Sequence, residues 1–454
     1  MLLVSTSLLF DCWRIDEPAA TDPLDQRTWA SLRVIVEGRC VTRFWDRRSA
    51  SEREAIYVPT FPLARWIVSN WWQLLYEPCR AESPPVESDR WLPEERHWVH
   101  RHCFRSAESG LFLPYLHFYS DGPGVSVAWS MDDAHAFPRM PGYFLYSGFA
   151  QFDALDAMTA MSDFVEKVLG WCSDLADDRV EMLRADWTAI TNADAEEKAF
   201  CRGAGRMGLD PYAIDEWNSE LVNLLTVGLG ARIEDALARD FLESTDAGTA
   251  KSVWQWVSNA ERDFDLKAGK SSAIDPGHGF RHAKDQGCFV AHQVRSLAGL
   301  VEDEPIEHLA ALLKRVGKTT FLFESNNHSP SRAVHAAVGW RDSTDAVVAG
   351  PQLSRPENQR FLESRGLYQA LVGCQEGARL VTRAHTWDQQ ASRAFAAELL
   401  APRKALALHT RADLEADERR ELEQQLANHY QVSAEVVRLQ LRNVGVWRQF
   451  DESS

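Results

Sequence analysis

The stretch from Arg360 to Leu400 brings together several side chains that could bind a metal or transfer a proton. Glu363 lies near its start, and His385, Asp388 and Glu398 lie in its second half. Imidazole and carboxylate groups are common zinc ligands and common acid–base groups. A zinc peptidase often presents two histidines and a glutamate as HExxH on one helix, and this motif occurs nowhere in the 454 residues. Any metal chemistry here would need a different arrangement of ligands.

One segment of this stretch resembles a known family. Phe395–Pro402 reads FAAELLAP, and it is similar to the segment that follows the active site in ImmA/IrrE-type zinc metallopeptidases. In that family a helix with RFxxAHExxH precedes an acidic ExEAN segment and then FAAELLMP. If Arg360 and Phe361 match the Arg-Phe of the helix, the first histidine, the glutamate and the second histidine fall on Arg365, Gly366 and Gln369.

These three residues cannot do the work of HExxH. The motif places two imidazoles one turn apart on one helix face, with the glutamate beside the zinc-bound water. Arg365 is a permanent cation that would repel zinc, Gly366 offers no base, and Gln369 is at best a weak neutral ligand. The resemblance therefore implies a protein without this catalytic site.

The third zinc ligand of the family is an acidic residue in the ExEAN segment. Here the segment reads DQQAS, so Asp388 keeps the first acid and Gln390 replaces the second. The resemblance implies a zincin-like metallopeptidase fold with no catalytic residue, no metal and no cofactor.

In place of the metal, Arg365 would supply a fixed positive charge. We expect its guanidinium to pair with Glu363, Asp388 or Glu398. Together with His385, these side chains are expected to line a cleft that is held shut or shaped for an acidic ligand.

The resemblance covers residues 285–450, roughly, and leaves three interpretations open. Active family members cleave helix-turn-helix repressors and so switch on mobile-element, stress or antiphage genes. The first interpretation is a non-catalytic regulatory, sensor or scaffold subunit that binds a protein, either a repressor or a defence-system effector. The second is a working peptidase with relocated ligands, for which His385, Asp388 and Glu398 are the candidates. The third is a transcriptional regulator that uses the C-terminal helices.

Composition limits the partners. The chain has 66 acidic and 49 basic residues, with a net charge of -17, and nucleic-acid affinity is built largely from Lys and Arg. The charge therefore argues against broad nucleic-acid binding. No apolar run is long enough to span a bilayer, and the eight cysteines are scattered without a CxxC pair, which is typical of reduced thiols. We expect a cytoplasmic bacterial protein with no membrane partner.

The pattern of apolar residues predicts an α+β protein in three regions. Residues 1–175 form an N-terminal α+β domain of unassigned function, residues 176–265 a helical region, and residues 266–454 the metallopeptidase-like domain. Strands are predicted at Leu2–Phe10, Leu32–Val36, Val41–Trp45, Leu111–Tyr119, Val125–Trp129, Thr319–Glu324, Val334–Trp340 and Ala346–Val348. Helices are predicted at Phe61–Tyr76, 151–175, Phe289–Leu300 and Pro305–Val316.

Two groups of histidines could bind a metal. His97, His100 and His102 lie in RHWVHRHCF, but no carboxylate accompanies them, which favours a structural role over a zinc site. In the polar loop Lys267–Gly279 and just beyond it, Asp275, His278 and His282 stand at one-turn spacing without a further ligand, which again favours loop and helix-start roles. The tetrapeptide GKTT at Gly317–Thr320 lacks the preceding glycine of a P-loop and follows a helix, so nucleotide binding is not predicted there.

The tail Leu422–Asn443 reads as two helices around a short break, with Ser433 as a natural N-cap. This pattern is typical of a helix-turn-helix, and its second helix offers Arg438 and Arg442 but also Glu435. Because positioning on phosphates would want more cations, we expect the apolar face of these helices to pack against the preceding domain.

Overall fold

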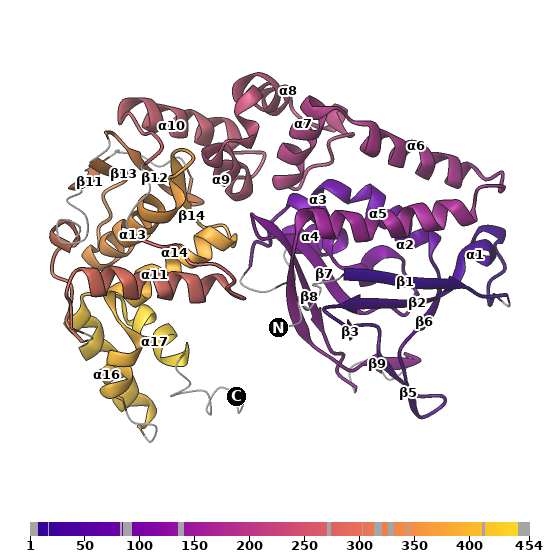
Figure 1. The fold of residues 1–454 in the computed structure, drawn as a ribbon, viewed down its shortest axis with the longest axis horizontal. Coiled ribbons are helices and arrows are strands. Elements are labelled where there is room, and N and C mark those ends of the chain that lie inside the picture. Colours follow the sequence, from indigo (N-terminus) through magenta and orange to yellow (C-terminus); the bar gives the residue numbers. More distant parts are fainter. Residues whose placement is uncertain are drawn as a thin grey trace. The chain divides into compact units, whose positions relative to one another are not determined.

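The computed structural model describes residues 8–16, 18–81, 84, 93–134, 140–269, 274–301, 303–312, 320–325, 331–342, 345–410 and 414–443. It divides into two compact units, Met1–Thr226 and Val227–Ser454 (Figure 1). The chain has a strand-rich N-terminus, a helical middle and helices at the C-terminal end, which confirms the predicted α+β class. The helices of residues 176–265 are shared between the two units.

The described part of the first unit contains three antiparallel sheets. Their strands are β1 (Leu8–Arg14), β2 (Trp29–Val36), β3 (Arg39–Cys40) and β6 (Ile56–Pro59); β4 (Phe44–Asp46), β5 (Ser51–Arg53) and β9 (Gly142–Phe144); and β7 (Tyr115–Ser120), β8 (Gly124–Ser130) and β10 (Gly148–Asp153). The helices are α1 (Pro23–Thr28), α2 (Phe61–Ser69), α3 (Trp71–Tyr76), α4 (Pro93–His102), α5 (Ala154–Trp171), α6 (Asp178–Asn192), α7 (Ala195–Arg206) and α8 (Ser219–Asn223).

Alternation of apolar residues explains the sheets. Every second residue of β2 is buried, and β2 pairs with β1 in a register that runs from Leu8 opposite Val36 to Arg14 opposite Ala30. The predicted strand Val41–Trp45 is wrong in its first half, because residues 41–43 form a turn between β3 and β4. Of the predicted strand Leu2–Phe10, residues 2–7 lie outside the described residues.

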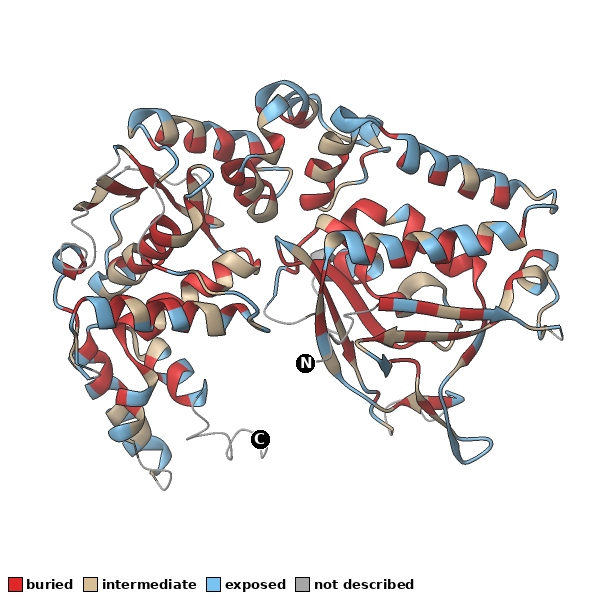
Figure 2. Cartoon of the chain, viewed as in Figure 1, coloured by how far each residue is buried: buried red, intermediate tan, exposed pale blue. Residues whose placement is uncertain are grey.

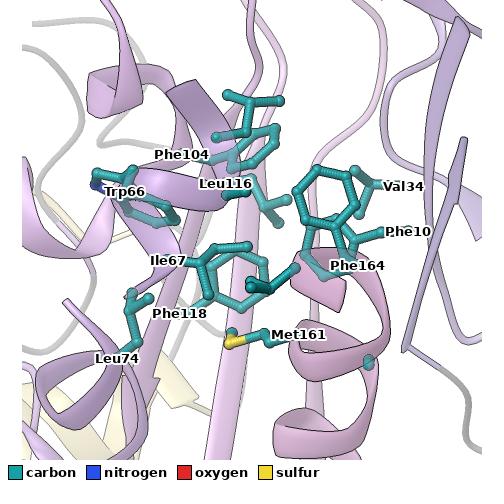
Figure 3. Packing of buried hydrophobic residues seen from close by; sticks show 14 of the residues in the cluster. Phe10, Val34, Trp66, Ile67, Leu74, Phe104, Leu116, Phe118, Met161 and Phe164 are labelled. Atoms are coloured by element: carbon teal, nitrogen blue, oxygen red, sulfur yellow. The ribbon is translucent and has the colours of Figure 1, made fainter. Parts of the chain in front are cut away.

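The core of the first unit is rich in aromatic rings. The ring centroids of Phe10 and Phe164 are 5.1 Å apart, and those of Phe10 and Phe118 are 6.1 Å apart. Figure 3 shows these rings together with Trp66 and Phe104 between the strands and helices. Figure 2 shows buried residues along one side of α6 and exposed residues along the other, as expected for a helix that covers a core.

The predicted helix Phe61–Tyr76 is two helices, α2 and α3, with a break at Asn70. Asn70 leaves the helical conformation (φ -118°, ψ 17°), and its side-chain amide donates to the carbonyl oxygen of Trp66 at 2.8 Å. Asparagine side chains compete in this way for helix carbonyls. Trp71 and Trp72 are buried, so the predicted aromatic core face is confirmed.

The second unit contains one mixed sheet in its described part, with strand order β11 (Thr320–Ser325), β13 (Asp345–Gly350), β12 (Val334–Trp340) and β14 (Arg379–Thr382). β11 and β13 are parallel, whereas β12 is antiparallel to both β13 and β14. The helices are α9 (Ala236–Ser244), α10 (Ala250–Asp263), α11 (Ala283–Leu297), α13 (Pro356–Tyr368), α14 (Trp387–Leu400), α15 (Arg403–Leu408), α16 (Ala416–Tyr430) and α17 (Ala434–Asn443).

The helices of the second unit pack in layers on this sheet. α13 contacts β12 and β13, α14 packs on α13, and α11 packs on α14. α11 lies close to α14 at Gly287, where a Cβ atom would lie 2.2 Å from the carbonyl oxygen of Ala391. α9 contacts β14 and α10 contacts β12.

The C-terminal helices belong to the same hydrophobic core. Tyr430, Val437 and Leu441 are fully buried in the cluster that also contains Phe395 of α14. The side-chain amide of Gln440 in α17 donates to a carboxylate oxygen of Glu398 at 2.9 Å. The prediction that these helices pack against the preceding domain is confirmed.

Several predicted features lie wholly or partly outside the described residues. Of the predicted helix Pro305–Val316, residues 313–316 are outside, as are residues 317–319 of the GKTT tetrapeptide.

All eight cysteines are described; none forms a disulfide, and seven are buried. Among the described residues, no helix is both long and apolar enough to cross a bilayer.

Candidate functional site

The stretch singled out in the sequence folds into α13, β14 and α14. α13 begins with Pro356 at its first turn, where the missing N–H has no helical partner to lose. It ends in a π-helical turn, Gln369–Gly373. α14 packs against α13, and the side chain of Arg365 on α13 contacts residues of α14 and β14.

Arg365 is 5% exposed, and all its hydrogen-bond partners among the described residues are neutral. Its Nε donates to the hydroxyl of Ser392 at 3.1 Å, and its Nη2 donates to the carbonyl oxygen of Thr382 at 2.7 Å and to Oε1 of Gln389 at 2.9 Å. The expected pairing with Glu363, Asp388 or Glu398 is therefore wrong. Three uncharged oxygens from β14 and α14 hold the guanidinium instead.

Gly366 faces the sheet. A Cβ atom at this position would lie 2.5 Å from Cγ2 of Val348 on β13. Such contacts essentially never occur, so α13 can approach β13 this closely only because residue 366 has no side chain. The position expected for a general base thus has no room for a glutamate.

Gln369 is fully buried, and neither its amide nitrogen nor its amide oxygen has a hydrogen-bond partner among the described residues. The hydroxyl of the neighbouring Tyr368 is likewise buried and unpartnered in that part of the chain. An amide without partners costs folding free energy, because it loses its hydrogen bonds to water.

Asp388 pairs with Arg379 at 2.7 Å, and Arg379 makes a bidentate pair with Asp240 of α9 at 2.7 and 2.9 Å. Asp240 also accepts from the backbone N–H of Leu380 at 2.8 Å. Burial would lower the pKa of Arg379, but Asp240 and Asp388 outweigh it and raise that pKa well above its usual value. Sequence reasoning missed Asp240 and Arg379. The available signal was a charged residue on the apolar face of α9 and another at the start of a buried strand.

The other carboxylates of the expected cleft are also engaged. Glu398 is fully buried near the C-terminal end of α14, where Nε of Arg403 lies 3.2 Å from its Oε2. His292 of α11 approaches the other oxygen at 3.3 Å. Glu363 accepts from the side-chain amide of Gln359 at 3.0 Å. Glu398 therefore links α14 to α11 and to α15.

His385 precedes α14. Its backbone carbonyl accepts from the side-chain amide of Gln390. Burial, followed by the charges of Arg393 and Arg365, lowers the pKa of its imidazole to about 4. At neutral pH the ring is uncharged.

The residues present do not fit zinc. Arg365 has only N–H donors, Gly366 has no side chain, and Asp388 is held by Arg379. Asp388 and Glu398 are ten residues apart on α14, which separates their backbones by about 15 Å along the helix axis. Zinc ligands lie about 2 Å from the ion, so these two carboxylates cannot share one. In the described ranges no group of three or more His, Cys, Asp or Glu side chains is arranged to hold a metal.

The first unit contains a second candidate cluster. His102 is fully buried, with Nε2 2.9 Å from Glu77 and Nδ1 2.6 Å from the carbonyl oxygen of Phe118. Arg101 adds a bidentate pair to Glu77 at 2.7 and 2.9 Å. A Glu–His pair could do acid–base chemistry, but both side chains are at most 1% exposed, so no substrate can reach them. The cluster is structural.

The two groups of histidines for which the sequence favoured structural and loop roles form no metal cluster among the described residues. His97 and His100 are exposed, whereas His102 is buried against Glu77. Asp275 caps its own loop by accepting from the N–H of Gly277 at 2.8 Å.

The buried groups of the first unit make its stability depend on pH. Burial, together with nearby His102, lowers the pKa of His117 from 6.5 to about 3. Between these two pH values, the unfolded chain binds a proton at His117 and the folded chain does not. Burial would raise the pKa of Glu77, but His102 and Arg101 outweigh it and lower the pKa from 4.5 to about 2. The contribution of His117 to the free energy of unfolding is complete above pH 6.5 and is lost as pH falls towards 3. The Glu77 contribution is complete above pH 4.5 and is lost as pH falls towards 2.

We therefore expect His117→Phe to flatten the pH dependence of unfolding between pH 6.5 and 4, by about 1.4 kcal/mol per pH unit at most. The measurement is urea unfolding of the wild type and the variant at several pH values, followed by the near-ultraviolet signal of the buried tryptophans. His97→Gln is the matched control, because His97 is exposed. Equal slopes in the wild type and His117→Phe would contradict this assignment.

Comparisons with family models, with curated proteins and with solved structures found no match. The resemblance to ImmA/IrrE-type metallopeptidases therefore stays a prediction from the residues of the C-terminal stretch.

Proposed function

We propose that this chain is a catalytically inactive relative of the ImmA/IrrE-type, zincin-like metallopeptidases. It acts as a regulatory, sensor or scaffold subunit that binds a protein, in repressor control or in antiphage defence. The observation that carries the proposal is the buried guanidinium of Arg365, fixed by Ser392, Thr382 and Gln389 at the position expected for a zinc-binding histidine.

Two further features support a non-catalytic role. The general-base position, Gly366, is pressed against Val348, and Asp388 is neutralised by Arg379. A peptidase with relocated ligands would need His385, Asp388 and Glu398 at one point. The length of α14 between Asp388 and Glu398 argues against that alternative.

The helix-turn-helix alternative is also disfavoured. In α17 the guanidinium of Arg438 lies 3.0 Å from Glu423 and 2.8 Å from Glu435, so its charge is already neutralised. A recognition helix needs cations free to contact phosphates and base edges. The net charge of -17 adds long-range repulsion from DNA.

The test is purification of the untagged chain from native cells, identification of co-eluting proteins, and incubation of each with the purified chain. We expect a stoichiometric protein partner that stays intact. Asp388→Ala, and the exposed control Asp417→Ala, should leave this result unchanged. Cleavage of the partner that a chelator stops, or that Asp388→Ala alone abolishes, would contradict the proposal. Elution with duplex DNA at physiological salt and without a protein would contradict it too.

A further inference from the structure

The sheet formed by β1, β2 and β6 buries one face in the core of the first unit (Figure 1). Leu8, Phe10 and Cys12 of β1 lie on this buried face. On the opposite face of the same strand, Leu9 is 48% exposed and Trp13 is 49% exposed. Of the tryptophans in the described part of the chain, Trp13 alone is exposed, although tryptophan is highly buried on average. The outer face of this sheet therefore carries an unusual side chain for a surface.

Trp13 is one wall of a hollow on this outer face. The strand register places Trp13 opposite Ser31 of β2, and Ser31 opposite Tyr57 of β6. Two aromatic side chains thus stand on either side of a small one, in a row across three strands. Tyr57 is 51% exposed. This row lines a hollow of about 520 Å³.

The size of the hollow indicates what class of ligand it can take. A volume of about 520 Å³ is far more than an ion or a single water needs, and it falls within the range of about 300–1,000 Å³ that is usual for organic ligands. Two strand spacings separate the Cα atoms of Trp13 and Tyr57 by about 10 Å. A flat ring between two aromatic planes needs only about 7–8 Å, that is, two contacts of about 3.5–4.0 Å. A saturated, puckered ring is thicker, so the spacing favours pyrrolidine or pyranose over a flat ring.

Two arginines at the same hollow have acidic partners. Nη2 of Arg33 lies 2.6 Å from Oδ2 of Asp11, and Nε of Arg53 lies 2.7 Å from Oδ2 of Asp46. The guanidinium of Arg33 also lies 4.9 Å from the centroid of the Trp13 ring, which helps to hold the indole in place. Because carboxylates already neutralise both arginines, the hollow is poorly suited to a phosphate group.

The hydrogen-bonding groups of the hollow are mainly donors. The indole of Trp13 and the guanidinium groups of Arg33 and Arg53 can only donate. The acceptor-only side chain, Glu54, is bonded to Arg43, and its second oxygen lies 3.6 Å from Arg33. A pyranose carries several hydroxyl groups that donate and therefore need acceptors, whereas a proline residue has a carbonyl group and no N–H. The balance of donors and acceptors favours proline over a sugar.

We propose that this hollow binds a proline-rich segment of a partner protein in the polyproline II conformation. One pyrrolidine ring packs between Trp13 and Tyr57, and neighbouring carbonyl groups accept from the indole and the guanidinium groups. A polyproline II segment has no internal hydrogen bonds and is already extended, so its carbonyls are available and little conformational entropy is lost on binding. The inference deepens the proposed protein-binding function and rests on it, because it names the class of partner and the surface that the partner contacts.

The experiment is titration of fluorescein-labelled octaproline with the full chain, followed by fluorescence anisotropy. We expect saturable binding that Trp13→Ala weakens about thirtyfold, the loss typical of a central aromatic anchor. Tyr57→Ala should weaken it about tenfold or more, and Trp13→Phe, which keeps a ring, should retain most of the affinity. Leu9→Ala is the matched control and should bind like the wild type. Leu9 lies on the same face of β1 and is equally exposed, but it does not line the hollow.

Two further probes exclude other ligands. A labelled (Gly-Ser)4 peptide, which does not favour polyproline II, should show no saturable binding, and cellohexaose should not displace octaproline. Displacement by cellohexaose that Trp13→Ala abolishes would identify a carbohydrate site and overturn the proposal. So would the absence of saturable octaproline binding, or equal losses of affinity in Trp13→Ala and Leu9→Ala. All variants should unfold cooperatively, because the three side chains lie outside the core; if Trp13→Ala does not, Tyr57→Ala decides.

This test can fail separately from the test of the proposed function. A co-purifying protein that Trp13→Ala and Tyr57→Ala bind as tightly as the wild type does would overturn the docking surface and leave the protein-binding function standing. Native cells that yield no protein partner would instead overturn the proposed function.

Discussion

Replacing Asp240 with alanine is expected to lower the free energy of unfolding of the C-terminal unit by about 3–5 kcal/mol. Asp240 is 3% exposed and holds Arg379 with two bonds of 2.7 and 2.9 Å. Its removal leaves a buried guanidinium with Asp388 as its remaining carboxylate and leaves the N–H of Leu380 without the bond it makes to Asp240. Breaking one side of a buried pair is costly because the other charge stays behind.

Urea unfolding with a helical and a tryptophan signal measures this loss. Asp235→Ala is the matched control, because Asp235 stands just before the same helix, is 51% exposed and pairs only at the surface with Arg232. The control should lose less than about 1 kcal/mol. Similar losses in the two variants would show that the Asp240–Arg379 pair does not hold α9 to β14.

Restoring the glutamate of HExxH at residue 366 is expected to lower the free energy of unfolding by a similar amount. Gly366→Glu places a Cβ atom 2.5 Å from Val348 and forces a carboxylate into the packed surface between α13 and β13. Overpacking costs about 1–3 kcal/mol, and a buried unpaired charge adds several more. We therefore expect the triple variant Arg365→His, Gly366→Glu, Gln369→His to unfold before it can bind zinc.

The steric part can be isolated with alanine. Gly366→Ala should destabilise by about 1–3 kcal/mol. Gly170→Ala, in the exposed last turn of α5 with no atom within 4 Å of the added Cβ, should instead stabilise by about 0.4–1 kcal/mol. A folded triple variant whose melting temperature rises with added zinc would contradict this account of Gly366.

Much of the fold could be predicted from local patterns of apolar residues. β2 and β8 follow from alternating apolar residues, and α5 and α11 follow from apolar residues at helical spacing, because burial of one face determines both periods. The break at Asn70 was not predicted, since it depends on a side-chain bond to a helix carbonyl inside an apolar run.

The candidate site was harder to predict, because its contacts join distant parts of the chain. Asp240 and Arg379 are separated by 139 positions, and no local pattern pairs them. Arg365 was placed correctly on a helix, but its neutral partners depend on how α14 packs against α13.

The central claim, that the chain carries no catalytic zinc, is tested most directly by the metal content of protein purified without a histidine tag. We expect inductively coupled plasma mass spectrometry to find no zinc above background in the folded chain. The reason is that Arg365, held by Ser392, Thr382 and Gln389, occupies the position expected for a zinc-binding histidine. One equivalent of zinc, lost together with a peptidase activity in Asp388→Ala or His385→Ala, would contradict the account.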